Sequence, residues 1–289
     1  MLDLLESNSY NVRRPQGRAL FRPAHLPSIF IFDLDGVVYL GDTPIPSAPP
    51  TIAAIERAGH PVYYLTNNSG RTRADYQAKL AKMDVPASQD RIFTSAYATA
   101  LYLRGQCAAG KCAYVVGESG IVHELDSMGI RPVTATDTLP YTQIDYVVVG
   151  IDRQFTYDKL RYAHACITRG GAQYVATNLD ATFPLEEGEI PGGGSIAASI
   201  TTATSRQPFV IGKPKPYALQ AILDDAGVHP EQAVLVGDRL DTDIAAGNSL
   251  GVPTVLVLTG VTSAAQAAEA PPEWKPTRII GDLGELLEE

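Results

Sequence analysis

The 289-residue chain has few cysteines and no hydrophobic run that approaches the ~20 residues of a membrane-spanning helix. Cys107, Cys112 and Cys166 are odd in number and match no zinc-binding spacing, which favours reduced thiols in a cytosolic protein. The start of the chain lacks the positive charge of a secretory leader, because Asp3 and Glu6 lie there. We therefore expect a cytoplasmic protein that does not contact a membrane.

Positive charge is also scarce. Lys and Arg number 23 against 32 Asp and Glu, which gives a net charge of −9. This balance argues against a nucleic-acid partner, since phosphate backbones bind basic surfaces. A small anionic ligand would need a local cation to offset the field. The composition, 45% hydrophobic and 19% charged, is typical of a globular protein, and the length allows one large domain or two moderate ones.

An apolar stretch at residues 29–32 is typical of a strand buried on both faces. It runs directly into Asp33, Asp35 and Gly36. The carboxyl ends of parallel strands are where open α/β sheets bind their ligands. Residues two apart on a strand point to one face, and two close carboxylates repel unless a cation lies between them or one is protonated.

The same pattern recurs along the chain. A helix at 51–58 leads to a second buried strand, 61–65, which ends at Thr66 and Asn67 and completes a βαβ unit. Further strands and helices are expected at 208–213, 217–226, 233–238, 241–250 and 254–258. These alternations predict an α/β protein with a doubly wound, Rossmann-like parallel sheet.

Between these two parts the alternation starts again. Strands are predicted at 112–116, 146–151 and 173–176, helices near 97–104, 120–128 and 157–169, and a loop at 180–194. We therefore predict three regions: an N-terminal surface extension at 1–28, a core at 29–86 plus 208–289, and an inserted α/β domain at 87–207.

Polar residues at the ends of the core strands should converge on one edge of the sheet. They are Asp33, Asp35, Thr66, Asn67, Lys213, Asp238 and Asp243. Four carboxylates with one lysine would be unfavourable without a further cation. Mg²⁺ suits such oxygen ligands together with a substrate phosphate. We expect Asp33 and Asp238 to bind it through carboxylates and Asp35 through its carbonyl, with Asp243 orienting a metal-bound water.

This arrangement predicts a Mg²⁺-dependent phosphomonoester hydrolase. Asp33 is the expected nucleophile and forms an aspartyl-phosphate. Asp35 is the expected general acid for the leaving group and then the base for water. Thr66, Asn67 and Lys213 are expected to hold the phosphoryl oxygens.

Four stretches in order resemble the motifs of the haloacid dehalogenase superfamily, namely residues 33–37, 66–68, 212–214 and 237–243. Three longer stretches, at 66–70, 176–184 and 191–196, resemble the p-nitrophenyl phosphatase branch of this superfamily. That branch includes NagD-like, phosphoglycolate and pyridoxal phosphate phosphatases. The resemblance covers about 29–258. It implies a large α/β cap inserted between the second and third motifs, the same roles for the matching acids and lysine, and dimerisation through the cap.

The substrate expected from this reading is a small phosphorylated metabolite, because a closing cap excludes water and bulky chains. Phosphoglycolate, nucleoside monophosphates, sugar phosphates and pyridoxal phosphate stay open, with p-nitrophenyl phosphate as an artificial substrate. Asn178, Asp180 and Thr182, which follow the strand at 173–176, are the predicted specificity residues. The alternative is a phosphate-accepting module like a two-component receiver domain, without turnover; the inserted domain and Asp35 argue against it.

Overall fold

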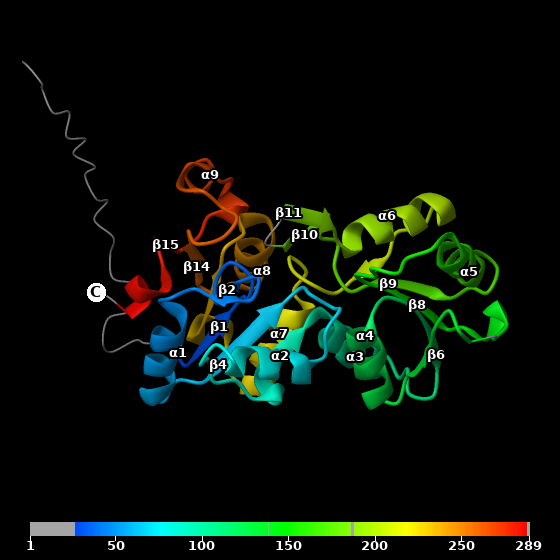
Figure 1. Cartoon of the computed structure of the whole chain (residues 1–289), viewed down its shortest axis with the longest axis horizontal. Helices are drawn as coiled ribbons and strands as arrows, with labels where there is room; N and C mark the ends of the chain where they lie inside the picture. Colours follow the sequence, from blue (N-terminus) through cyan, green and yellow to red (C-terminus); the bar gives the residue numbers. More distant parts are fainter. Residues whose placement is uncertain (1–26, 138, 186–187, 288–289) are drawn as a thin grey trace, which may run out of the picture.

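The computed structural model describes residues 27–137, 139–185 and 188–287. Figure 1 shows two sheets side by side along the long axis, one built from the blue, cyan and orange parts of the chain and the other from its green part. The extension predicted for 1–28 lies outside the described residues except for its last two. Within the described part, no helix is long and apolar enough to cross a membrane.

The core sheet has six strands, all parallel, in the order β15-β14-β13-β1-β4-β5. Their bounds are β1 Ile29–Phe32, β4 Val62–Thr66, β5 Ile92–Thr94, β13 Ala233–Gly237, β14 Thr254–Val257 and β15 Arg278–Ile280. The chain winds outward from β1 in one direction and from β13 in the other. The switch point of this doubly wound sheet therefore lies between β1 and β13, where a ligand site is expected.

Strand β1 is central because its side chains alternate between two apolar layers. Phe30 and Phe32 pack with helices α1 (Ala48–Arg57) and α2 (Arg73–Ala81), whereas Ile29 and Ile31 pack with α7 (Tyr217–Ala226). All four residues are buried, as the uninterrupted apolar run predicts. The helices of the core are α1 Ala48–Arg57, α2 Arg73–Ala81, α7 Tyr217–Ala226, α8 Ala245–Leu250 and α9 Ala264–Ala268. A π-helical turn, Leu240–Ile244, precedes α8, and 3₁₀ turns lie at Gln89–Arg91, Tyr141–Gln143, Pro230–Gln232, Pro272–Trp274 and Leu283–Leu287.

The second sheet has five parallel strands in the order β12-β9-β8-β6-β7. Its elements are β6 Cys112–Val116, β7 Arg131–Val133, β8 Tyr146–Val149, β9 Gln173–Ala176 and β12 Phe209–Val210, with α3 Ser95–Gly105, α4 Ser119–Ser127, α5 Tyr157–Thr168 and α6 Gly193–Thr204. Helices α5 and α6 cover one face, and α3 and α4 the other. The α/β class and the central parallel sheet predicted from the sequence are confirmed.

Sheet membership differs from the predicted boundaries at both ends of the insertion. Strand β5 pairs with β4 of the core, although it lies inside the predicted 87–207 segment. Strand β12 pairs with β9 of the second sheet, although it lies after residue 207. Both strands are two or three residues long, so their partners are decided by tertiary packing rather than by a local pattern. The division into a core and a cap stays a proposal. Judged by sheet membership, the chain would leave the core after β5, near residue 95, and return to it after β12, near residue 211.

Two hairpins complete the fold. The first joins β2 Tyr39–Leu40 to β3 Thr43–Pro44. The second joins β10 Thr182–Leu185 to β11 Gly188–Pro191 and replaces the loop expected at 180–194. Residues of both hairpins line the same cavity, described next.

Candidate active site

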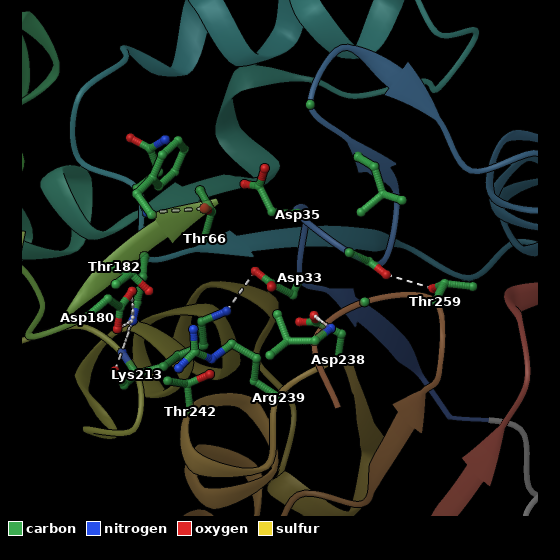
Figure 2. Close-up of a pocket in the computed structure, with 18 residues that line it drawn as sticks. Asp33, Asp35, Thr66, Asp180, Thr182, Lys213, Asp238, Arg239, Thr242 and Thr259 are labelled. Atoms are coloured by element: carbon green, nitrogen blue, oxygen red, sulfur yellow. Dashed lines mark hydrogen bonds and ion pairs between the residues drawn. The ribbon is translucent and has the colours of Figure 1, made fainter. Parts of the chain in front are cut away.

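A cavity of about 370 Å³ opens at the carboxyl end of the core sheet, between the two sheets. Asp33 follows β1, Thr66 ends β4, and Asp238 follows β13, so three parallel strands deliver side chains to one place. Figure 2 shows the labelled side chains around this common space. The predicted residues that line the cavity are Asp33, Asp35, Thr66, Asn67, Asp180, Thr182, Lys213 and Asp238; Asp243 and Asn178 lie outside the lining.

Lys213 joins two of the carboxylates. Its Nζ lies 2.7 Å from Asp33 Oδ1 and 2.6 Å from Asp243 Oδ1, and it donates to the Leu65 carbonyl at 3.2 Å. Burial by itself lowers the pKa of Lys213, but the charges and hydrogen bonds of Asp243 and Asp33 outweigh it and raise the pKa. The ammonium therefore stays protonated. Asp243 does not line the cavity and influences it through its ion pair with Lys213.

Three carboxylates form a cluster in which oxygens of Asp33, Asp238 and Asp243 lie within 4.8 Å of one another. Burial raises the pKa of Asp33 well above its usual range, with Asp243 and Asp238 adding to the effect and Lys213 opposing it. Burial, with the Asp243 charge, raises the pKa of Asp238 to about 7. Taken without a further cation, the cluster is thus electrostatically unfavourable.

Asp238 shows where that cation fits. Its Oδ2 accepts a hydrogen bond from the Val261 N–H at 2.7 Å. Its Oδ1 is buried and has no hydrogen-bond partner among the described residues. Because a buried carboxylate oxygen is costly unless it is paired, this unpartnered oxygen, on a carboxylate of the cluster that includes Asp33, suits a hard divalent cation.

Gly36 brings the backbone close to this cluster. Its φ is +81°, which L side chains rarely adopt, and a Cβ there would lie 2.4 Å from Asp238 Oδ2. Both the turn and the close approach therefore require glycine. The turn lies directly after Asp33 and Asp35 in the sequence.

Asn67, directly after β4, connects that strand end to Lys213 and Asp180. Its Nδ2 donates to the Lys213 carbonyl at 2.9 Å and to both Asp180 carboxylate oxygens at 3.1 Å, and its Oδ1 accepts from the Lys213 N–H at 2.8 Å. The side-chain amide is thus engaged in holding Lys213 and Asp180. Phosphate binding by Asn67 stays a prediction, and its observed contacts are positional.

Asn178 also has a positional role. Its Nδ2 donates to the Asn67 carbonyl at 2.7 Å, and its Oδ1 accepts from the Asp180 N–H at 3.0 Å. It is buried and does not line the main cavity. Asp180 and Thr182 do line that cavity, and the substrate contact predicted for all three residues stays a prediction.

Comparison with known proteins agrees with this geometry. A family model described as haloacid dehalogenase-like hydrolase matches residues 30–131, and a second, HAD-hydrolase-like, matches 210–286. The chain is 36% identical over 259 residues to the 5'-nucleotidase YutF of Bacillus subtilis, covering 89% of this chain and 96% of that protein. The chain belongs to the haloacid dehalogenase-like hydrolases.

Other relatives of this hydrolase are named phosphatases. Human glycerol-3-phosphate phosphatase is 36% identical over 254 residues, covering 81% of this chain and 79% of that protein. The structure of glycerol phosphate phosphatase Rv1692 from Mycobacterium tuberculosis with magnesium superposes with a TM-score of 0.82 at 35% identity, covering 91% of this chain and 77% of that one. Rv1692 has also been solved with calcium. The chain is a phosphatase of this family, and the receiver-like alternative is not favoured.

Sequence reasoning missed several residues of this hydrolase that line the cavity: Leu40, Phe183, Arg239, Thr242, Thr259 and Val261. Arg239 and Thr242 lie inside the fourth motif, so their spacing from Asp238 could have identified them. The Arg239 guanidinium donates to both Asp241 oxygens, at 3.2 and 3.0 Å. Phe183 lies inside the stretch 176–184 that resembles the p-nitrophenyl phosphatase branch, whereas Leu40, Thr259 and Val261 reach the cavity through a hairpin and a loop placed by tertiary packing.

Proposed function

We propose that this hydrolase is a Mg²⁺-dependent phosphomonoesterase that acts through an aspartyl-phosphate on Asp33. The observation that carries the proposal is the surroundings of Asp33. It lies at the cavity wall, paired with Lys213 and within 4.8 Å of the Asp238 and Asp243 oxygens. A buried carboxylate beside a fixed cation and an orphan metal ligand is placed to attack a phosphoryl group held by the same charges.

The residues proposed to hold Mg²⁺ are Asp33, Asp238 and the carbonyl of Asp35, with Asp243 supporting them. The orphan Asp238 oxygen and the all-oxygen donor set support this choice of ion, as does the magnesium complex of the M. tuberculosis relative. When bound, the ion would neutralise charge on the carboxylates and the substrate phosphate.

The chemical steps use the chain's own side chains. Asp33 forms a bond to phosphorus while the bond from phosphorus to the leaving oxygen breaks, and Asp35 gives that oxygen its proton. Asp35 then takes a proton from the water that cleaves the aspartyl-phosphate and releases inorganic phosphate. Burial raises the pKa of Asp35, against the opposing charges of Lys79, Lys213 and Arg71, and so favours its acid form. Lys213 and Thr66 stabilise the transferring group.

The proposed substrate is a small phosphorylated metabolite, and glycerol phosphate heads the candidates. A cavity of about 370 Å³ has room for a small ester, and two relatives are named for glycerol phosphate. Phosphate release from a panel of glycerol phosphate, phosphoglycolate, nucleoside monophosphates, sugar phosphates and pyridoxal phosphate with Mg²⁺ tests the proposal. Failure to turn over any of these, or p-nitrophenyl phosphate, would contradict it.

Two neighbouring residues on the cap side should respond differently to alanine. Thr182 lines the cavity, so Thr182→Ala should lower kcat/KM for the preferred metabolite about 10-fold more than for p-nitrophenyl phosphate. Asn178 holds Asn67 instead, so Asn178→Ala should lower both constants in parallel. The measurement is the ratio of the two constants in each variant. Parallel losses in Thr182→Ala would place specificity elsewhere.

A further inference from the structure

The hairpin β2–β3 separates the active-site cavity from a second hollow. Leu40 and Gly41 line the cavity, whereas Asp42 and Pro44 line a hollow of about 600 Å³ on the other side. The hollow is completed by residues of α2 and its flanks: Arg71, Asp75, Ala78, Lys79, Lys82 and Met83. A two-strand hairpin of this size has little stability of its own, so its position depends on what holds it from behind.

Lys79 of α2 holds the hairpin at three points. Its Nζ donates to the Gly41 carbonyl at 2.6 Å, lies 3.4 Å from Asp42 Oδ1, and lies 3.6 Å from the centroid of the Tyr39 ring. The Lys79 side chain is 13% exposed and that of Asp42 is 83% exposed. The Asp42 pair is therefore the weakest of the three contacts, and the carbonyl and the ring are the main ones.

Tyr39 passes this restraint on to Asp35. Tyr39 is buried, forms an isolated β-bridge with Asp35, and accepts a hydrogen bond from the Gly36 N–H at 2.8 Å through its carbonyl. Its own N–H donates to the Leu34 carbonyl at 3.2 Å. The segment from Leu34 to Tyr39 thus forms a tight loop held by its own backbone hydrogen bonds. A shift of the Tyr39 ring would move the backbone that carries Asp35.

We propose that Lys79 is a positioning residue that aims Asp35 at the leaving oxygen by fixing the hairpin and Tyr39. The inference rests on the proposed role of Asp35 as general acid. Lys79 lies outside the cavity lining and does not contact Lys213, Thr66 or the carboxylate cluster, whose own hydrogen bonds hold them. Its loss should therefore impair proton donation rather than phosphate binding.

Proton donation can be isolated by the choice of leaving group. An alkoxide such as that of glycerol needs a proton to depart, whereas p-nitrophenolate is a stable anion that leaves without one. In a two-step covalent mechanism, kcat/KM covers the steps up to departure of the leaving group and excludes hydrolysis of the aspartyl-phosphate. The ratio of kcat/KM for glycerol phosphate to that for p-nitrophenyl phosphate therefore reports the acid, and it is independent of the fraction of active enzyme.

The test is this ratio in Lys79→Met, with Mg²⁺ present. We expect it to fall about 10-fold, a part of the roughly 10²–10⁴-fold that general acid catalysis provides. Lys79→Arg keeps a cation over the Tyr39 ring and should recover most of the ratio. Lys82→Met is the matched control, because Lys82 is exposed on the same hollow, three residues further along, and should leave the ratio unchanged.

Asp35→Asn, measured alongside, distinguishes the positioning role of Lys79 from the general-acid role of Asp35. If Asp35→Asn lowers the ratio and Lys79→Met leaves it within about twofold of wild type, the positioning role of Lys79 is wrong. If Asp35→Asn leaves the ratio unchanged, the general-acid role itself fails. An equal fall in Lys82→Met would also overturn the inference, since it would reflect the surface charge. Should Lys79→Met not fold, Lys79→Gln, which also removes the cation from the Tyr39 ring but keeps a polar side chain, supplies the same comparison.

Discussion

Asp33→Asn should abolish turnover of every phosphomonoester while leaving the fold intact. The amide cannot act as a nucleophile, and loss of a covalent nucleophile costs roughly 10⁴-fold or more in kcat. The change is nearly isosteric, and the Asn carbonyl can still accept from Lys213. Burial raises the pKa of Asp33, which means that its ionised form is less stable in the folded protein than in water. A neutral amide should therefore not lower the Tm of the metal-free protein at neutral pH.

Phosphate release and thermal unfolding of the purified variant check this expectation. Asp158→Asn is a suitable control, because it is the same substitution at an exposed residue of α5 whose carboxylate pairs with Arg161 on the surface. The control should keep wild-type activity. Residual activity of Asp33→Asn within about 10-fold of wild type, on a scale where each 1.36 kcal/mol is tenfold, would exclude Asp33 as the nucleophile.

Removal of divalent metal has the second large expected effect. EDTA should eliminate turnover, and Mg²⁺ should restore it, because the clustered acids and the substrate phosphate repel one another without a cation. Ca²⁺ should occupy the site but support little turnover, since its longer bonds and higher coordination number disturb the in-line geometry. Activity after EDTA treatment and addition of each ion is the measurement.

Metal binding itself can be followed without turnover. Mg²⁺ and Ca²⁺ should each raise the Tm of the EDTA-treated protein, since a ligand that binds only the folded state stabilises it. Asp238→Asn should lose this shift, and Asp158→Asn should keep it. Equal rates with both ions, or full activity in EDTA, would argue against the metal site.

The central fold could be predicted because its strands carry a strong local signal. Residues 29–32 and 233–237 are apolar throughout, so they cannot be edge strands or amphipathic helices, and the structure places them side by side. The strands at 112–116 and 173–176 and the helix at 217–226 have the predicted bounds. Polar residues at the ends of such strands must converge, and the cavity lining shows that they do.

The rest of the fold and of the cavity lining depends on contacts between distant segments. Strands β5 and β12 are too short to reveal which sheet they join, and the hairpins that bring Leu40 and Thr182 to the cavity carry no alternating pattern. Asn178 was predicted to contact substrate because of its position in the chain. In the structure its amide donates to the Asn67 carbonyl, a partner 111 residues away, and its substrate contact stays a prediction. Spacing identifies residues of a suitable type, and tertiary structure decides which of them face the substrate.

The proposed aspartyl-phosphate can be sought directly, and its location is the sharpest test of Asp33 as the nucleophile. The wild-type protein would be mixed with substrate and Mg²⁺, quenched in acid during turnover, and reduced with borohydride, which converts an acyl phosphate on aspartate to homoserine. Peptide mass spectrometry would then locate the converted residue. We expect homoserine at position 33, only in samples quenched with substrate and metal. Conversion at Asp35, Asp238 or Asp243 instead, or none during active turnover, would contradict covalent catalysis by Asp33.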